Sequence, residues 1–132
     1  MSKKIKKQDD SPSMKQKPED RYPVFCFKYL QQYSYSSCTD ASFFIAFLER
    51  LKKLGGLGWQ GIRGANRHSF GVEKMPIKKI KIKNFPSIVT EEVEALMVFR
   101  ATGSNLPFLG IQHGDIFQVI FIEANFGDIY DH

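Results

Sequence analysis

The sequence predicts an α+β fold in which two helices near the N-terminus pack on one face of an antiparallel sheet of four to five strands. Two observations lead to this prediction. Residues 39–55 have the apolar spacing of an amphipathic helix, and the segments after residue 80 are rich in β-branched and aromatic residues and contain a hairpin signal. The 132 residues suffice for one hydrophobic core, and 12 Phe in a chain that is 42% hydrophobic indicate a packed domain.

Residues 21–132 are expected to form this single domain, and residues 1–20 a disordered basic arm. The arm carries six Lys and four acidic side chains but almost no large apolar ones, so it cannot bury enough surface to offset the entropy of ordering. It lacks the apolar core of a signal peptide, and no apolar run in the chain approaches the roughly 20 residues of a membrane span. We therefore expect a cytoplasmic protein that has no membrane partner.

The first helix is the clearest element of the sequence. Thr39 or Asp40 can cap its N-terminus, and Gly55 is expected to end it. An aromatic-rich strand is expected before it, within residues 22–33, and a short second helix after it, over residues 57–68. The apolar stripe of the first helix consists of Phe44, Phe47, Leu48, Leu51 and Leu54.

The glycine-rich stretch over residues 55–71 contains the pattern G-x-G-x-x-G at Gly56, Gly58 and Gly61. In a dinucleotide-binding protein this pattern follows a strand and opens a helix within a βαβ unit. Here it follows an amphipathic helix, so we expect a helical connector and no small-molecule cofactor.

The second half of the chain is predicted to form strands. Residues 80–83 alternate isoleucine with lysine, which favours a strand with one exposed face. Residues 95–102 form a further expected strand, and residues 106–124 a hairpin with its turn at Gly114 and Asp115. The run from Phe117 to Ile122 is so apolar that we expect it to be a central strand.

Five side chains are candidates for catalysis. Histidine exchanges a proton near neutral pH, and arginine stabilises a phosphate that gains charge during a reaction. Such groups have the chemistry for metal-independent cleavage of RNA, in which a base takes the 2′-OH proton and an acid protonates the leaving 5′ oxygen. Structural interpretations remain open, since a histidine can cap a helix end and the arginine in the 95–102 strand can pair with Glu73 or Glu123. The five candidates are Arg67, His68, Arg100, Tyr130 and His132.

Four other basic residues are candidates for binding nucleic acid, and the net charge of +5 fits a polyanionic partner. If residues 80–83 form a strand, its lysines share one face and can line a phosphate track. Alternatively, lysines protect an edge strand from pairing with another chain. The four candidates are Arg63, Lys79, Lys81 and Lys83.

No metal cofactor is expected. His68, His113 and His132 together with Asp131 would make a ligand set, but nothing in their spacing supports one. The two cysteines also lack the spacing of a zinc site.

The order of these elements resembles the RelE/ParE-like superfamily of small toxins from bacterial toxin–antitoxin pairs, over about residues 22–132. An apolar strand precedes the helical pair "ASFFIAFLERLKKLGGLGWQGI", the basic segment "RGANRHSFGVEKMP" and a meander that ends in an aromatic residue and a histidine. The chain is longer than typical members, has the additional arm, and has a less basic meander.

The resemblance implies an endoribonuclease that cleaves mRNA, free or on the ribosome, or in the ParE branch a gyrase poison. It also implies an antitoxin protein that wraps the basic surface. By position, Arg100 would stabilise the phosphate, and Tyr130 and His132 would be the C-terminal reactive residues. Two other interpretations stay open. One is a noncatalytic nucleic-acid- or protein-binding module of the same fold. The other is an accessory protein of a phage or mobile element that binds nucleic acid through its lysines and its arm.

Overall fold

The computed structural model describes residues 20–33, 35–65, 70–102 and 106–132. Residues 1–19, which make up nearly all of the expected arm, lie outside this description, as do Arg67 and His68. The fold is α+β, as predicted. In chain order its elements are β1 (Val24–Cys26), η4 (Tyr35–Ser37), α1 (Ala41–Arg63), β2 (Glu73–Pro76), η5 (Ile77–Lys79), β3 (Ala95–Arg100), β4 (Pro107–His113) and β5 (Ile116–Ile122).

The sheet has five strands in the order β1-β5-β4-β3-β2. The prediction of an antiparallel sheet is correct for three of its strand pairs, but β1 and β5 run parallel. The reason is that the tight turn between β4 and β5 lies beside the start of β1, where the Val24 amide donates to the Asp115 carbonyl at 2.9 Å. β5 therefore leaves this point in the same direction as β1. β5 is an interior strand, as its apolar run predicted.

The two predicted helices form one helical segment, α1, which a kink divides. Asp40 caps α1 by accepting a hydrogen bond from the Ser42 amide at 3.0 Å, as expected. The helix does not end at Gly55, because Gly55 keeps helical backbone angles and a glycine inside a helix weakens it without ending it. The break comes at Gly58, which has φ +82° and ψ 159°, and helical structure then continues to Arg63.

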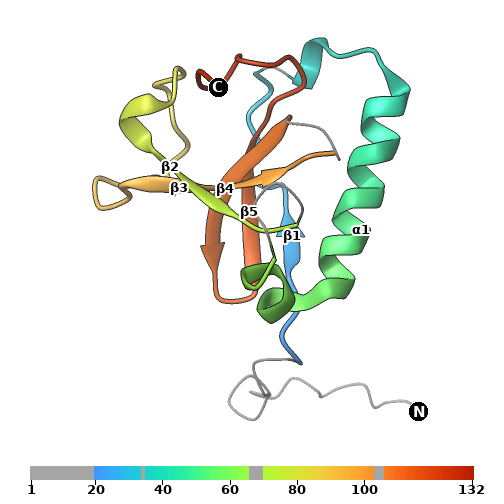
Figure 1. The fold of residues 1–132 in the computed structure, drawn as a ribbon. Helices are drawn as coiled ribbons and strands as arrows, with labels where there is room; N and C mark the ends of the chain where they lie inside the picture. Colours follow the sequence, from blue (N-terminus) through green and yellow to red (C-terminus); the bar gives the residue numbers. More distant parts are fainter. Residues whose placement is uncertain (1–19, 34, 66–69, 103–105) are drawn as a thin grey trace, which may run out of the picture.

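α1 covers one face of the sheet, as Figure 1 shows. The apolar stripe predicted for this helix is wrong at two positions. Phe43, which the stripe left out, is buried, whereas Leu48, which it included, is 65% exposed. Phe47 and Leu54 were predicted to be buried, and the structure buries both. The main aromatic partners of α1 on the sheet are Phe99, Phe108 and Phe117.

The other face of the sheet has its own hydrophobic core. Chain segments that contain no long helix cover this core. Leu96, Val98 and Leu109 pack there against Ile80 and Ile129. Ile80 also forms an antiparallel bridge with Tyr130, so the segment after η5 and the C-terminal segment lie side by side. The C-terminal segment, residues 123–132, is therefore tied to the face of the sheet opposite α1.

The predicted strand over residues 80–83 is wrong. Regular pairing in this region ends with β2 at Pro76, and the chain then turns through η5 to the single bridge at Ile80. The Ile77 amide still donates to the Glu94 carbonyl at 2.9 Å, and the chain leaves the sheet after this hydrogen bond. The alternation of isoleucine and lysine reflects burial of Ile80 and partial burial of Ile82.

A β-bulge in β5 determines which face Glu123 occupies. β4 pairs Leu109 with Phe121 but Gly110 with Val119, so Ile120 is an extra residue. Because side chains alternate along a strand, one extra residue reverses the alternation after it. Val119 therefore faces α1, whereas Phe121 and Glu123 lie on the opposite side with the C-terminal segment.

Candidate functional site

Three of the five predicted catalytic residues lie in one pocket on the face of the sheet opposite α1. The pocket has a volume of about 430 Å³. Arg100 at the end of β3 lies on its wall beside Glu73 at the start of β2. The C-terminal segment supplies the other wall with Phe126, Tyr130, Asp131 and His132.

Arg100 forms an ion pair with Glu73. Its Nη2 atom donates to Glu73 Oε2 at 2.9 Å, and the two side chains are 9% and 21% exposed. The pairing follows from the sheet register: Glu73 lies opposite Val98, and Arg100 lies two residues farther along β3 on the same face. Glu73 was one of the two partners expected for Arg100, and the ion pair fixes a cation at the pocket wall.

His132 is held by a buried carboxylate. Its Nε2 atom lies 2.6 Å from Oε1 of Glu123, whose side chain is fully buried. The other oxygen, Oε2, accepts a hydrogen bond from the Ile129 amide at 2.7 Å. A carboxylate in this position orients the imidazole. Nδ1 is the ring nitrogen that can then exchange a proton with a substrate.

Two aromatic rings hold the imidazole plane. The centroid of Phe126 lies 3.8 Å from that of His132, with an angle of 24° between the planes. The ring of Tyr130 lies at 4.3 Å and 31°. Two rings this close cannot share one side of an imidazole, so they lie on opposite sides of it. The side chain of His132 is consequently 12% exposed, although it is close to the end of the described chain.

Tyr130 contributes a neutral phenol to the pocket. Burial raises its pKa above the ordinary value of 10.0, and the nearby Arg100 guanidinium only partly opposes this shift. The hydroxyl therefore keeps its proton at neutral pH and can donate a hydrogen bond.

Lys81 contacts the C-terminal segment through both its backbone and its side chain. Its backbone amide donates to the Ile129 carbonyl at 2.7 Å, and its Nζ atom donates to the Gly127 carbonyl at 2.7 Å. The same ammonium forms an ion pair with Asp131 at 3.0 Å, and this hydrogen bond raises the pKa of Lys81.

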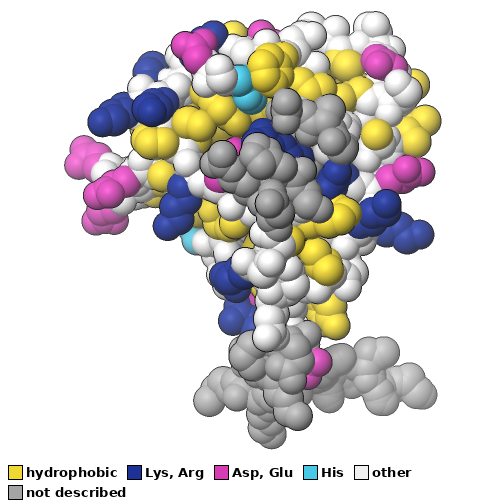
Figure 2. Space-filling model, in the orientation of Figure 1, with side chains coloured by type: hydrophobic (Ala, Val, Ile, Leu, Met, Phe, Trp, Pro, Cys, Tyr) yellow, Lys and Arg dark blue, Asp and Glu magenta, His cyan; other side chains and the backbone are white. Residues whose placement is uncertain are grey.

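The other predicted nucleic-acid-binding residues do not gather beside Lys81 in a strand. Lys79 belongs to η5, and Lys83 Nζ donates to the Lys78 carbonyl at 3.1 Å. Arg63 lies at the far end of α1, over the Trp59 ring at 5.7 Å and 3.4 Å from Gln112 Oε1. Figure 2 shows lysine and arginine side chains in several separate groups on this face, with acidic side chains among them.

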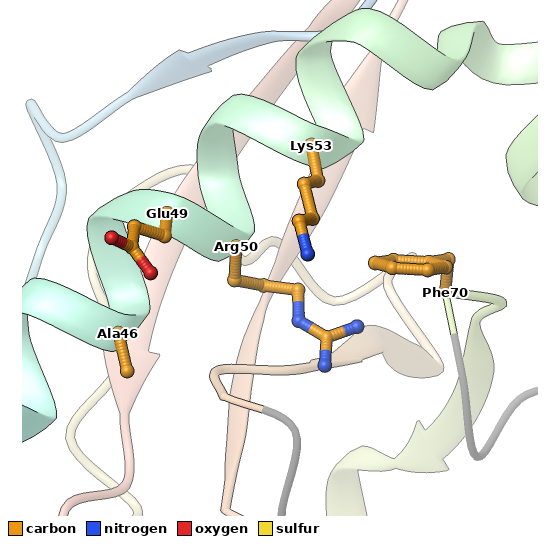
Figure 3. A pocket seen from close by; sticks show the side chains of 5 residues that line it. All are labelled: Ala46, Glu49, Arg50, Lys53 and Phe70. Carbon is orange, nitrogen blue, oxygen red and sulfur yellow. The ribbon is translucent and has the colours of Figure 1, made fainter.

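A second pocket lies on the α1 side of the molecule, and Figure 3 shows its side chains. Arg50 of α1 is partly buried there. Its Nη2 atom donates to the Thr102 carbonyl at 2.9 Å, and its guanidinium lies 4.5 Å from the centroid of Phe70. The pocket has a volume of about 210 Å³.

Glu73, Glu123 and Phe126 were not predicted as site residues. The sequence suggested both glutamates as partners of Arg100, and the structure assigns Glu73 to it but Glu123 to His132. One available signal was the position of Glu123, a lone carboxylate directly after the most apolar strand. Its face, however, depends on the bulge.

Neither a metal site nor a membrane helix is found in the part of the chain that the structure describes. No group of three or more His, Cys, Asp or Glu side chains is arranged there to hold a metal ion. None of the helices in the same part of the chain is long and apolar enough to cross a membrane. The chain has no significant match among protein-family models, curated proteins or solved structures.

Proposed function

We propose that this protein is a metal-independent endoribonuclease whose reaction takes place in the pocket between Arg100 and the C-terminal segment. One observation carries the proposal. Arg100, Tyr130 and His132, selected from the sequence for this chemistry, line one pocket although they come from β3 and from the chain end. Two carboxylates accompany them, so the site holds an acid, a base and a fixed cation.

The reaction needs one proton acceptor and one proton donor. In this proposal Glu73 takes the proton of the 2′-OH, and the 2′ oxygen attacks the adjacent phosphorus. The bond from phosphorus to the 5′ oxygen breaks, and that oxygen takes a proton from His132. The products are one RNA that ends in a 2′,3′-cyclic phosphate and one that begins with a 5′-OH.

The remaining residues stabilise charge and position the acid. A guanidinium has five N–H donors, so Arg100 can hold Glu73 and bind a phosphate oxygen at once. The Tyr130 hydroxyl donates a second hydrogen bond to the phosphate. Glu123 acts through His132: it stabilises the imidazolium and fixes which nitrogen carries the transferable proton.

The resemblance to RelE/ParE-like toxins supports the same proposal and extends it to partners. We propose mRNA, free or on the ribosome, as the substrate, the cytoplasm as the place of action, and an antitoxin protein as the inhibitor. A small acidic or DNA-binding reading frame next to the gene would favour this assignment. Co-expression of its product is then expected to suppress RNA cleavage.

The test is an RNA cleavage assay with the full chain and a metal chelator, with and without translating ribosomes. We expect products with cyclic phosphate ends. Replacing His132→Gln should slow cleavage by about 10²–10⁴-fold, the usual contribution of one general acid or base. His113→Gln is the matched control, since His113 is exposed at the end of β4. RNA that stays intact under both conditions would reject the proposal.

A noncatalytic binding module is the second candidate. The observation that favours it is that Glu73 pairs with Arg100 and Glu123 pairs with His132, as in a purely structural network. On this interpretation His132→Gln and Arg100→Lys lower the melting temperature or the affinity for a partner, and no cleavage exists for them to change. Measuring melting temperature and cleavage on the same samples separates the two functions.

A further inference from the structure

The second pocket has the composition of an anion site. Arg50 and Lys53 are one turn apart on α1, and Figure 3 shows their cationic ends on the same side of the helix, with the ring of Phe70 beside them. The Glu49 carboxylate lies on the other side of Arg50, beside Ala46 and away from the two cationic groups. Two like charges held near one another repel, and an anion between them removes that repulsion.

Arg50 is held in place before any anion arrives. The Thr102 carbonyl accepts from its Nη2 atom, and the Phe70 ring lies against the guanidinium plane. Arginine presents its donors in a planar fork that matches phosphate geometry, and a fixed fork loses less entropy on binding than a mobile one. Burial also lowers the pKa of Arg50, in agreement with a guanidinium partly removed from water.

The hollow continues past Lys53 and Phe70 over Gly56 and Leu57, where a further volume of about 430 Å³ is open. Leu57 is 42% exposed and Phe70 is partly buried, so this part of the surface is mainly apolar. A ribose or a base can therefore lie beside a phosphate that Arg50 and Lys53 bind.

This pocket and the proposed reaction site lie on opposite faces of the sheet, and short links of the chain join them near the edge strand β2. Phe70 is three residues before Glu73, and Thr102 is two residues after Arg100. At no more than about 3.6 Å per residue, these links span at most about 11 Å and 7 Å. With about 3.4 Å of rise per nucleotide in a stacked strand, such separations correspond to a few nucleotides.

We propose that Arg50 and Lys53 form a second phosphate subsite, which binds the RNA backbone a few nucleotides from the phosphate that reacts beside Arg100. The inference rests on the proposed function for its substrate. The anion site itself rests on the geometry of α1, Phe70 and Thr102. This subsite binds the RNA strand and takes no part in the reaction.

The first test measures binding of the full chain to a short single-stranded RNA whose 2′-OH groups are methylated, so that it is not cleaved. Lys53→Gln should weaken binding several-fold and lower the slope of log K against log salt concentration by about 0.7, the effect of losing one phosphate contact. Lys52→Gln, the exposed neighbour outside the pocket, should have a clearly smaller effect. Glu49→Gln should tighten binding. Equal effects of the two lysine replacements overturn the inference.

Inorganic phosphate is the second probe. A saturable change of the Phe70 and Lys53 amide signals in NMR spectra is expected, and Lys53→Gln should abolish it. If phosphate saturates the site but Lys53→Gln leaves RNA affinity unchanged, the pocket binds a free anion and the inference is wrong.

The outcome is separable from that of the cleavage assay. His132→Gln should slow cleavage by about 10²–10⁴-fold, and the difference in RNA affinity between Lys53→Gln and Lys52→Gln should persist in its background. If RNA stays uncut while Lys53→Gln weakens binding more than Lys52→Gln, the endonuclease proposal fails and the phosphate subsite stands. If RNA is cut and the two lysine variants bind RNA equally well, the phosphate subsite fails and the endonuclease proposal stands.

Discussion

Glu123 tests the proposed mechanism at the scale of one residue. Replacing Glu123→Gln keeps the shape of the side chain and an oxygen for the Ile129 amide, but removes the charge beside His132. We expect cleavage to fall by about 100-fold or more, because the imidazolium loses its stabilising partner and the ring its fixed tautomer. In urea unfolding, Glu123→Gln should lose less free energy of unfolding than Glu123→Ala. The alanine variant leaves the Ile129 N–H unsatisfied, at a cost of about 1–3 kcal/mol. A normal cleavage rate in the glutamine variant would exclude a role for Glu123 in positioning His132.

The stability of the folded domain at alkaline pH is expected to depend on Tyr130. Burial raises the pKa of Tyr130 in the folded protein above the ordinary 10.0, so the unfolded chain loses this proton first. The stabilising contribution is therefore complete below pH 10 and declines as the pH rises toward the pKa of the folded state. Unfolding measured between pH 8 and 11 should lose stability less steeply in Tyr130→Phe than in the natural protein. Tyr22→Phe, at an exposed tyrosine, is the matched control, and parallel curves for the natural protein and Tyr130→Phe would contradict the expectation.

The site residues also show what could be predicted from the sequence one residue at a time. Arg100, Tyr130 and His132 were chosen for their chemistry, and that choice needed no knowledge of the sheet. Glu123 was not predicted as the partner of His132 because its orientation depends on the extra residue Ile120 in β5. A bulge arises from the pairing of two strands, so a local pattern in one strand does not reveal it.

At the scale of elements, two glycines of α1 are expected to respond in opposite directions to alanine. Gly58 has φ +82°, and a Cβ there would lie 3.2 Å from the Arg21 carbonyl oxygen, so Gly58→Ala should destabilise the fold by about 1–3 kcal/mol. Gly55 is helical with open space around it, and Gly55→Ala should stabilise by about 0.5–1 kcal/mol. Urea unfolding of both variants measures the difference. The same sign for both would show that the kink does not lie at Gly58.

The same elements show where local patterns are sufficient. The cap at Asp40, the hairpin turn at Gly114 and the interior position of β5 follow from short-range rules, and all three predictions are confirmed. The parallel pairing of β1 with β5 and the turn at η5 depend on residues distant in the sequence. The lysines at 79–83 were assigned to a strand face because their alternation resembles that of a strand, but tertiary contacts of Ile80 and Lys81 decide their place.

At the scale of the whole molecule, the distribution of charge separates binding from catalysis. Residues 1–20 contribute six Lys against four acidic side chains, and the rest of the chain carries a net charge of +3. The residues proposed for the reaction all lie in the described domain. Binding through diffuse charge depends steeply on salt, whereas chemistry at a preorganised pocket does not.

Removing residues 1–19 therefore tests whether the arm contributes to RNA binding while the domain carries out catalysis. We expect KM for RNA to rise, and the salt dependence of binding to become shallower, because six lysines are lost. The value of kcat should stay unchanged, because Arg100 keeps its contact with Glu73 and His132 keeps its contact with Glu123. Single-turnover cleavage at saturating RNA, repeated over a range of salt concentrations, measures both quantities. A fall in kcat would place part of the catalytic machinery in the arm. If the truncated chain loses all RNA affinity, the pocket is not the main binding site, and an accessory protein that binds nucleic acid through its charge becomes the better description.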